Sequence, residues 1–210
     1  VAPYFEKYFN SQIKNERNTR EIQRHYDERD IDIITNVLQK LWLEDFYQYT
    51  QSLGGTTAEI MKELLEFEAD RRALAITINS FGTDLNDPTN RDSKRQDLYC
   101  NFGKLYPEAT LGKFNNVGDL ASLASALQPY TVYAELWRKS QEGGKSFTDQ
   151  MYQYERDICV RAFESQSHFA CFYAFTKLKQ QEERNLKWIL TCVEQGRDAK
   201  AKERWISIFY

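Results

Sequence analysis

One segment decides the fold: HFACFYAFTKLKQQEERNLKWILTCVEQ, which covers residues 168–195. Along it, one line of residues alternates steps of four and three, which is typical of a helix with one buried face. The line comprises Cys171, Phe175, Leu178, Glu182, Asn185, Ile189 and Cys192. Its centre is polar, because Glu182 and Asn185 stand where the pattern favours Leu or Ile. A buried carboxylate needs a donor, so this helix is expected to pack against an element that carries a cation.

A second segment, residues 57–81, has the sequence TAEIMKELLEFEADRRALAITINSF and the same spacing. Its line comprises Ile60, Leu64, Phe67, Arg71, Leu74, Ile78 and Phe81. Arg71 takes the central place. The hypothesis is that both long helices lie in the core and that each carries one charged group, which neighbouring helices satisfy. An equally open interpretation is that Arg71 extends to solvent and Glu182 lies in a surface groove.

The composition limits the classes of protein to which this chain can belong. The 210 residues are 41% hydrophobic, enough for one large helical domain or two smaller ones. The net charge is -3 and no basic stripe is interleaved with aromatics, so nucleic acid is not an expected partner. The longest uncharged runs, 120–134 and 165–176, are shorter than the roughly 20 residues that a bilayer span needs. The opening VAPYFEKYF has neither a basic leader nor an apolar block, so no signal peptide is expected.

The four cysteines show no CxxC spacing. They are Cys100, Cys159, Cys171 and Cys192. Three of them stand in apolar helical stretches, so buried free thiols in a reducing compartment are predicted.

The remaining elements are also predicted to be helical. One long helix, capped by Asp30 or Asp32, ends at Gly54 and Gly55, and Thr56 with Glu59 has the spacing of a capping box for the next one. Residues 83–95 are polar and predict a surface loop. Short helices are predicted around Leu98, from Pro107, over 119–127 and over 130–139. Ser146 is predicted to cap a longer one that ends near residue 166. No alternating stretch supports a sheet, so the fold class is all-α, with long antiparallel helices.

Searches for chemical motifs give no catalytic, cofactor-binding or metal-ligating residues. Gly143-Gly144-Lys145-Ser146 has only the end of a phosphate loop, without the upstream glycine or a preceding strand, and is better explained as a helix-capping turn. Neither histidine has the Glu-x-x-His spacing of a di-metal carboxylate bundle. Two alternatives stay open: a hydrolase or metal-dependent enzyme using Glu68, Asp70 and Glu182, and a free-standing helical scaffold.

The chain contains a short internal echo. Phe67-Glu68-Ala69-Asp70 and Tyr154-Glu155-Arg156-Asp157 share the pattern aromatic-Glu-x-Asp, each within a predicted long helix. Coincidence and duplication both explain a match of this length.

Several long motifs together resemble one family. They are LEFEADRRALAITINSFGT at 65–83, KLYPE at 104–108, the segment 168–195 and WISIF at 205–209, with LGGTTAEIM and APYF in support. The sequence closely resembles the subunit d family of vacuolar-type proton ATPases, which is related to the corresponding rotor protein of archaeal A-type ATPases. The resemblance covers most of this chain but only the C-terminal part of the family protein.

The resemblance implies a non-catalytic rotor subunit with no cofactor. Its expected fold is a pseudo-threefold funnel of repeated helical domains, here an N-terminal segment over 1–30 with a charged insertion from residue 10, a middle repeat over 31–110 and a C-terminal repeat over 111–210. The implied partners are the proteolipid ring and the central-stalk subunits, with another chain as a possible source of the missing N-terminal domain. The implied location is peripheral, on the cytoplasmic face of vacuolar or other acidic endomembranes.

The resemblance also supplies candidate framework and partner-contact residues. The positions that match the family motifs are Glu68, Asp70, Arg71, Arg72, Asn79, Glu182, Arg184 and Asn185. Glu155 is added as a helical carboxylate that can pair with neighbouring cations. Glu183 departs from the pattern, because many family members have cysteine there. These residues are expected to hold long helices rigid first and to contact partners second.

Overall fold

The computed structural model describes residues 3–4, 6–7, 28–105, 114, 116–143, 145–165 and 167–197, without the side chains of 28–30 and 92–93. Over these residues the fold is all-α, as predicted, and no strand occurs. The longer helices are α3 (Glu28–Ser52), α4 (Gly55–Ser80), α7 (Leu120–Leu127), α8 (Thr131–Glu142), α9 (Phe147–Glu164) and α10 (Ala170–Glu194). Short helical turns between α4 and α7 are η2 (Asp84–Asn86), α5 (Pro88–Asn90), η3 (Arg91–Arg95) and η4 (Gln96–Leu98).

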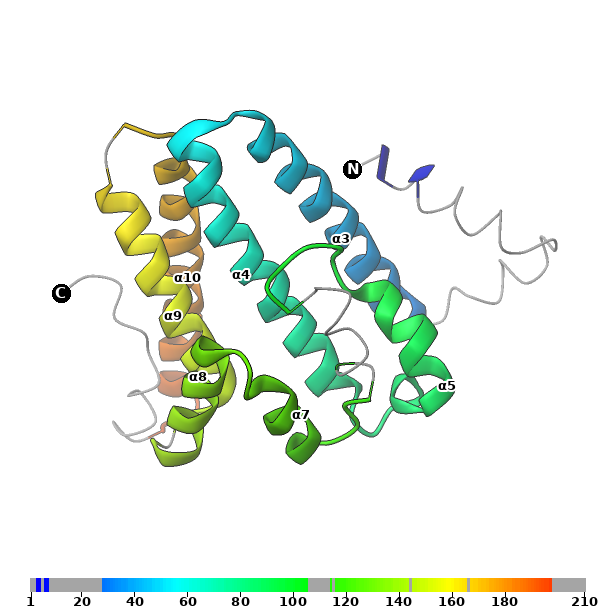
Figure 1. Cartoon of the computed structure of the whole chain (residues 1–210). Coiled ribbons are helices and arrows are strands. Elements are labelled where there is room, and N and C mark those ends of the chain that lie inside the picture. The colour runs from blue at the N-terminus through cyan, green and yellow to red at the C-terminus, as the bar shows by residue number, and fades with distance from the viewer. Residues whose placement is uncertain are drawn as a thin grey trace.

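Two antiparallel hairpins form the body of the molecule. Helices α3 and α4 make one hairpin, helices α9 and α10 make the other, and α4 lies between α3 and the second hairpin (Figure 1). The core is built where α4 meets its neighbours, around Leu65, Leu74, Leu123 and Leu127, which are almost fully buried. Helices α7 and α8 lie across one end of this array and close the core there (Figure 1).

The local sequence explains most helix boundaries. Asp119 caps α7 by accepting from the Ser122 backbone N–H at 2.7 Å, and the Ser122 hydroxyl completes the capping box. Ser146 caps α9 as predicted, since its Oγ accepts from the Asp149 N–H. The four cysteines are free, as predicted, and three of them are buried. None of the described helices is both long and apolar enough to span a membrane.

Two predicted helix starts are wrong. Helix α3 begins at Glu28, so Asp30 and Asp32 lie inside it and do not cap its start. The capping box of Thr56 is absent, because Gly54 and Gly55 adopt positive φ angles of 65° and 57° and α4 begins at Gly55. The Thr56 position is therefore already helical, and no side chain caps the start of α4.

The predicted surface loop over 83–95 is also wrong in part. This segment forms successive short helical turns, and Arg95 at its end is completely buried. The Arg95 guanidinium donates to Phe114 O at 3.0 Å, to Ser80 Oγ at 3.2 Å and to Asn86 Oδ1 at 3.4 Å. A polar segment is therefore folded against the end of α4 through one buried cation.

Four features of the sequence analysis lie mainly outside the described residues, so they are untested. The helix expected from Pro107, the WISIF motif and the insertion from residue 10 fall mainly on residues that the structure does not describe. The boundary between repeats near residue 110 falls there too, so the division into 31–110 and 111–210 stays a prediction.

The buried cation gives a stability prediction. Arg95→Leu should lower the free energy of unfolding by about 2 to 4 kcal/mol, because two buried acceptors and one part-buried acceptor lose a charged donor. Lys94→Leu is the control, since Lys94 is the adjacent residue but is exposed, and it should change the free energy by less than about 0.5 kcal/mol. Urea unfolding curves measure both, and equal midpoints for the two variants would contradict the buried role of Arg95.

Candidate functional site

Arg71 lies at the centre of a group of charged and aromatic side chains between α4, α9 and α10. Its Nε is 3.4 Å from Glu155 Oε1 on α9, its Nη2 is 4.0 Å from Glu68 Oε1, and its Nη1 donates to Tyr152 Oη at 3.3 Å. Burial lowers the pKa of the guanidinium, but Glu155, Tyr152 and Glu68 raise it by more, so the net pKa shift is upward. Arg71 therefore remains charged although its side chain is only 19% exposed.

Glu68 connects α4 to α10. Lys177 Nζ lies 2.6 Å from Glu68 Oε2, and the Tyr173 hydroxyl donates to the same oxygen. Burial alone raises the pKa of Glu68, but Lys177, Tyr173 and Arg71 together bring that pKa below its ordinary value. The carboxylate is therefore held in its charged form by groups from two helices.

Glu155 connects α9 to both neighbours. One of its oxygens faces Arg71, and the other accepts from Gln181 Nε2 of α10 at 2.5 Å. These contacts join three helices in one network, here called the charged cluster. It consists of Glu68, Arg71, Tyr152, Glu155, Tyr173, Lys177 and Gln181.

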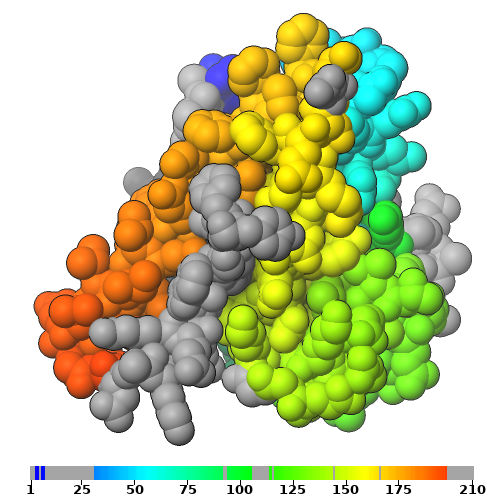
Figure 2. All heavy atoms as spheres, turned by 90° about the vertical axis from the view of Figure 1, so that its left-hand side faces the viewer, coloured from blue at the N-terminus to red at the C-terminus, as the bar shows by residue number. Residues whose placement is uncertain are grey.

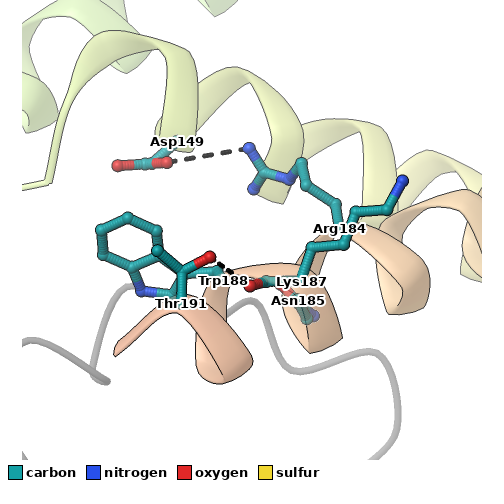
Figure 3. A pocket seen from close by; sticks show the side chains of 6 residues that line it. All are labelled: Asp149, Arg184, Asn185, Lys187, Trp188 and Thr191. Carbon is teal, nitrogen blue, oxygen red and sulfur yellow. Dashed lines mark hydrogen bonds and ion pairs between the residues drawn. The ribbon is translucent and has the colours of Figure 1, made fainter. Parts of the chain in front are cut away.

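A hollow of about 330 Å³ lies beside the charged cluster, between the start of α9 and the second half of α10 (Figure 3). It is lined by Asp149, Arg184, Asn185, Lys187, Trp188 and Thr191. Arg184 stacks its guanidinium over the Tyr152 ring at 3.7 Å from the ring centre, and its Nη1 lies 3.9 Å from Asp149 Oδ1. The hollow thus combines charges of both signs with an indole, and Arg184 connects it to the charged cluster through Tyr152.

Asp70 faces away from this cluster and fixes a different part of the chain. Its carboxylate accepts from the Tyr133 hydroxyl at 2.5 Å and from the backbone N–H groups of Lys104 at 3.1 Å and Leu105 at 3.0 Å. Gly103 is required beside it, since its φ is +124° and an added Cβ would lie 2.4 Å from Asp70 Oδ1. Burial raises the pKa of Asp70 to about 6, although all three hydrogen bonds lower it.

The other two candidates on α4 have separate positions. Arg72 joins α4 to α3, because its Nη1 donates to Gln39 Oε1 at 2.6 Å and its Nη2 to Asn36 Oδ1 at 3.5 Å. Burial lowers the pKa of Arg72. Asn79 is exposed and lies about two turns beyond Arg71 along the helix.

Of the two open interpretations of Glu182, burial in the core is wrong and a surface position is observed. Its side chain is 42% exposed and pairs with Lys179 of the same helix at 2.6 Å. The buried polar residue on this part of α10 is Gln181, and Phe175, also on the predicted line, is 46% exposed. The buried face is thus rotated by about one residue at these two positions, while Leu178, Asn185 and Cys192 are buried as expected. Arg71 is paired, as hypothesised, but with Glu155 and Glu68.

Sequence reasoning missed four members of the charged cluster: Tyr152, Tyr173, Lys177 and Gln181. A usable signal exists for two of them, because Lys177, Gln181 and Asn185 follow one another in steps of four along the face that is buried. The aromatic members gave no such signal, since Tyr173 stands next to the exposed Phe172.

The two copies of the aromatic-Glu-x-Asp echo lie against each other. The rings of Phe67 and Tyr154 are 5.0 Å apart, and the glutamates that follow them, Glu68 and Glu155, both face Arg71. The carboxylates of the enzyme alternative do not converge, because Glu68, Asp70 and Glu182 each have different partners. Among the described residues, no three His, Cys, Asp or Glu side chains are placed to hold a metal ion. The ion pairs and hydrogen bonds of these candidate residues hold the helices together.

Comparison with known proteins gives the family. The sequence model of the family described as "ATP synthase (C/AC39) subunit" matches residues 1–204. The chain belongs to this family. Among curated C/AC39 relatives, V-type proton ATPase subunit d1 of Arabidopsis thaliana is 39% identical over 211 residues, covering 100% of this chain and 55% of the relative. V-type proton ATPase subunit d of Dictyostelium discoideum is 41% identical over 184 residues, covering 87% of this chain and 50% of the relative. V-type proton ATPase subunit d of Saccharomyces cerevisiae is 34% identical over 210 residues, covering 100% of this chain and 54% of the relative.

The chain therefore spans about half the length of the curated C/AC39 relatives it matches. The match to the family extends over both hairpins and over the charged cluster between them. The use of the candidate residues as partner contacts stays a prediction, whereas their contacts within the chain are described above.

The charged cluster generates a stability prediction for this C/AC39 family member. Arg71→Leu should lower the free energy of unfolding by about 3 to 5 kcal/mol, because Glu155 and Glu68 are left buried without their shared cation. Glu182→Leu should change it by less than about 0.5 kcal/mol, since Glu182 belongs to an exposed ion pair. Thermal or urea melts measure both, and a Glu182 variant as unstable as the Arg71 variant would refute this assignment of the buried face.

The Asp70 carboxyl generates a prediction of pH dependence. Its pKa is about 6 in the folded protein against 3.8 without the fold, so the folded state binds the proton more readily. The contribution of Asp70 to the free energy of unfolding should therefore be highest below pH 4 and fall as the pH rises to about 6, by about 3 kcal/mol or less. The wild type should gain this amount relative to Asp70→Asn between pH 7 and pH 4. Asp97→Asn, which changes an exposed carboxylate, is the control, and parallel pH profiles for all three proteins would contradict the prediction.

Proposed function

We propose that this chain acts as a non-catalytic rotor subunit of a vacuolar-type proton-pumping ATPase and couples the central stalk to the proteolipid ring. The observation that carries the proposal is the similarity of the whole chain to curated subunit d proteins of V-type proton ATPases. Such a role places the chain on the cytoplasmic face of vacuolar or other acidic endomembranes as a peripheral subunit.

The internal contacts support a mechanical role. A coupling element transmits torque only if its helices keep their relative positions under load. Here α4, α9 and α10 share the charged cluster, α4 is tied to α3 through Arg72, and Asp70 ties α4 to α8. Sliding one helix past another by a turn, about 5.4 Å, would break several of these contacts at once, so sliding is costly.

The enzyme alternative has less support. Its three carboxylates, Glu68, Asp70 and Glu182, are respectively bound to Lys177 and Tyr173, to backbone amides and Tyr133, and to Lys179. No two of them share a partner in the contacts described above. A free-standing scaffold would also use such a framework, and only a search for partners separates it from a rotor subunit.

Affinity purification tests the proposed function. The tagged chain, purified in mild detergent from cells that express it, should bring down both proteolipid-ring and central-stalk subunits, identified by mass spectrometry. A tagged helical protein of similar size and charge serves as the control. Recovery of the chain as a lone monomer, with ATPase complexes intact in the same lysate, would overturn the proposal in favour of the scaffold.

A further inference from the structure

The hollow beside the charged cluster opens between two helices that pack against each other. Helices α9, in yellow, and α10, in orange, lie side by side in Figure 2. The volume of about 330 Å³ has room for a large aromatic side chain, but it is at the lower end of the roughly 300–1,000 Å³ of small-molecule sites. The indole of Trp188 lines the hollow together with the polar and charged side chains (Figure 3). Its size and its indole favour an apolar occupant.

The charged side chains of the hollow are already engaged within the chain. Asp149 accepts from the Ser146 hydroxyl at 2.8 Å, and its other oxygen lies 3.9 Å from Arg184 Nη1. Lys187 Nζ lies 2.6 Å from Glu183 Oε1. A phosphate or another small anion binds best where cations are not already paired. A small anion is therefore a poor occupant.

One donor of the hollow still lacks an acceptor. Arg184 Nε is buried and has no hydrogen-bond partner among the described residues, although the guanidinium stacks over the Tyr152 ring. A buried donor without an acceptor costs about 1 to 3 kcal/mol. A peptide segment can supply a backbone carbonyl as the acceptor while its apolar side chains fill the remaining space. The hollow therefore fits a short segment of polypeptide with large apolar side chains.

Helix α10 ends close to this hollow. Gly196 has a φ of 60°, its N–H donates to Val193 O at 3.1 Å, and the N–H of Arg197 donates to Cys192 O at 2.9 Å. This pair of hydrogen bonds is a Schellman motif, which terminates a helix. Thr191, which lines the hollow, lies about two turns before Arg197. The residues that follow Arg197 therefore begin beside the hollow.

The sequence after Arg197 has the required composition. Residues 198–204 are DAKAKER, and residues 205–209 are WISIF, in which four of the five side chains are apolar. Seven extended residues span up to about 25 Å. The far end of the hollow at Arg184 is about 20 Å from Arg197 along α10, at 1.5 Å per residue. The WISIF motif, which lies outside the described residues, can therefore reach the hollow from within the same chain.

We infer that the WISIF motif at residues 205–209 binds in the hollow between α9 and α10. Its large side chains pack against Trp188, and one of its backbone carbonyls accepts from Arg184 Nε. The bound motif connects the start of α9 to the second half of α10, next to the charged cluster. This inference concerns the packing of the chain on itself and does not rest on the proposed function in the ATPase.

Hydrogen-exchange mass spectrometry of the full 210-residue chain tests the inference. The amides of residues 205–209 should exchange at least about tenfold more slowly than in a free peptide of the same sequence. Thr191→Arg, which fills the hollow, should remove most of this protection. Thr176→Arg is the matched control, because Thr176 is an exposed α10 residue that does not line the hollow. Both threonines donate to the carbonyl four residues earlier at 2.9 Å, and the control should keep the protection within about twofold.

A variant of the motif supplies the reciprocal measurement. Trp205→Ala changes no residue of α9 or α10, and it should speed exchange over residues 184–194 by at least about threefold, because the hollow loses its occupant. Ser207→Ala, which removes only a hydroxyl, should leave that exchange unchanged. Peptides of α4 check that each variant is folded, and Trp205→Ala decides the question if Thr191→Arg is not.

Each outcome supports or overturns the inference. Protection that Thr191→Arg removes and Thr176→Arg keeps, with faster exchange over residues 184–194 in Trp205→Ala, supports it. The inference is overturned if residues 205–209 exchange as the free peptide does, if Thr191→Arg keeps their protection, or if Trp205→Ala leaves residues 184–194 unchanged. Protection that is lost on dilution also overturns it, since the motif would then bind to a second copy of the chain.

Discussion

The pairing of the Arg71 guanidinium with two carboxylates is the interaction on which the rest of the structure depends. The guanidinium is held between Glu68 of its own helix and Glu155 of α9, and both carboxylates reach onward to α10 through Lys177 and Gln181. Removing these charges from water is costly, so they are tolerated only where every partner is present. That condition is met in one arrangement of the three helices, because a shift of α9 by a turn would carry Glu155 out of reach of Arg71. The apolar core alone would be less selective, since Leu and Phe side chains pack acceptably in several registers.

Three polar side chains of helix α4 each contact a different part of the chain. Arg71 faces α9, Asp70 holds the segment around Leu105 and Tyr133 of α8, and Ser80 near its end receives Arg95. Each contact specifies a partner that hydrophobic burial does not specify. The two pKa shifts agree with these different surroundings. The pKa of Glu68 is lowered by its cationic partners, whereas the pKa of Asp70, which has only neutral hydrogen-bond donors, is raised by burial.

The features that the sequence predicts correctly are those that depend on residues close together in the chain. The long helices of residues 57–81 and 168–195 and the cap at Ser146 were predictable because they rest on local periodicity and on side chains near in sequence. The identity of the charged partners was not, because Glu155 and Arg71 are far apart in the chain. The face of α10 was misassigned around Glu182 because Phe175, on the predicted line, is exposed, and an apolar residue at the surface misleads any argument from periodicity. Arg95 was missed because nothing in a polar run indicates that its last cation is buried.

The inner joint of the helical body and its outer faces differ in how they are stabilised. A joint buried between helices excludes water, so its charged groups must be paired, whereas the outer face of a helix has no such requirement. Helices α3 and α10 keep Trp42 and Leu186 at the surface. The interior joint between α4 and α9, by contrast, is registered by Arg71 and Glu155. The four long helices thus combine an inner joint that is fixed by paired charges with outer helices, α3 and α10, that keep some large apolar side chains exposed.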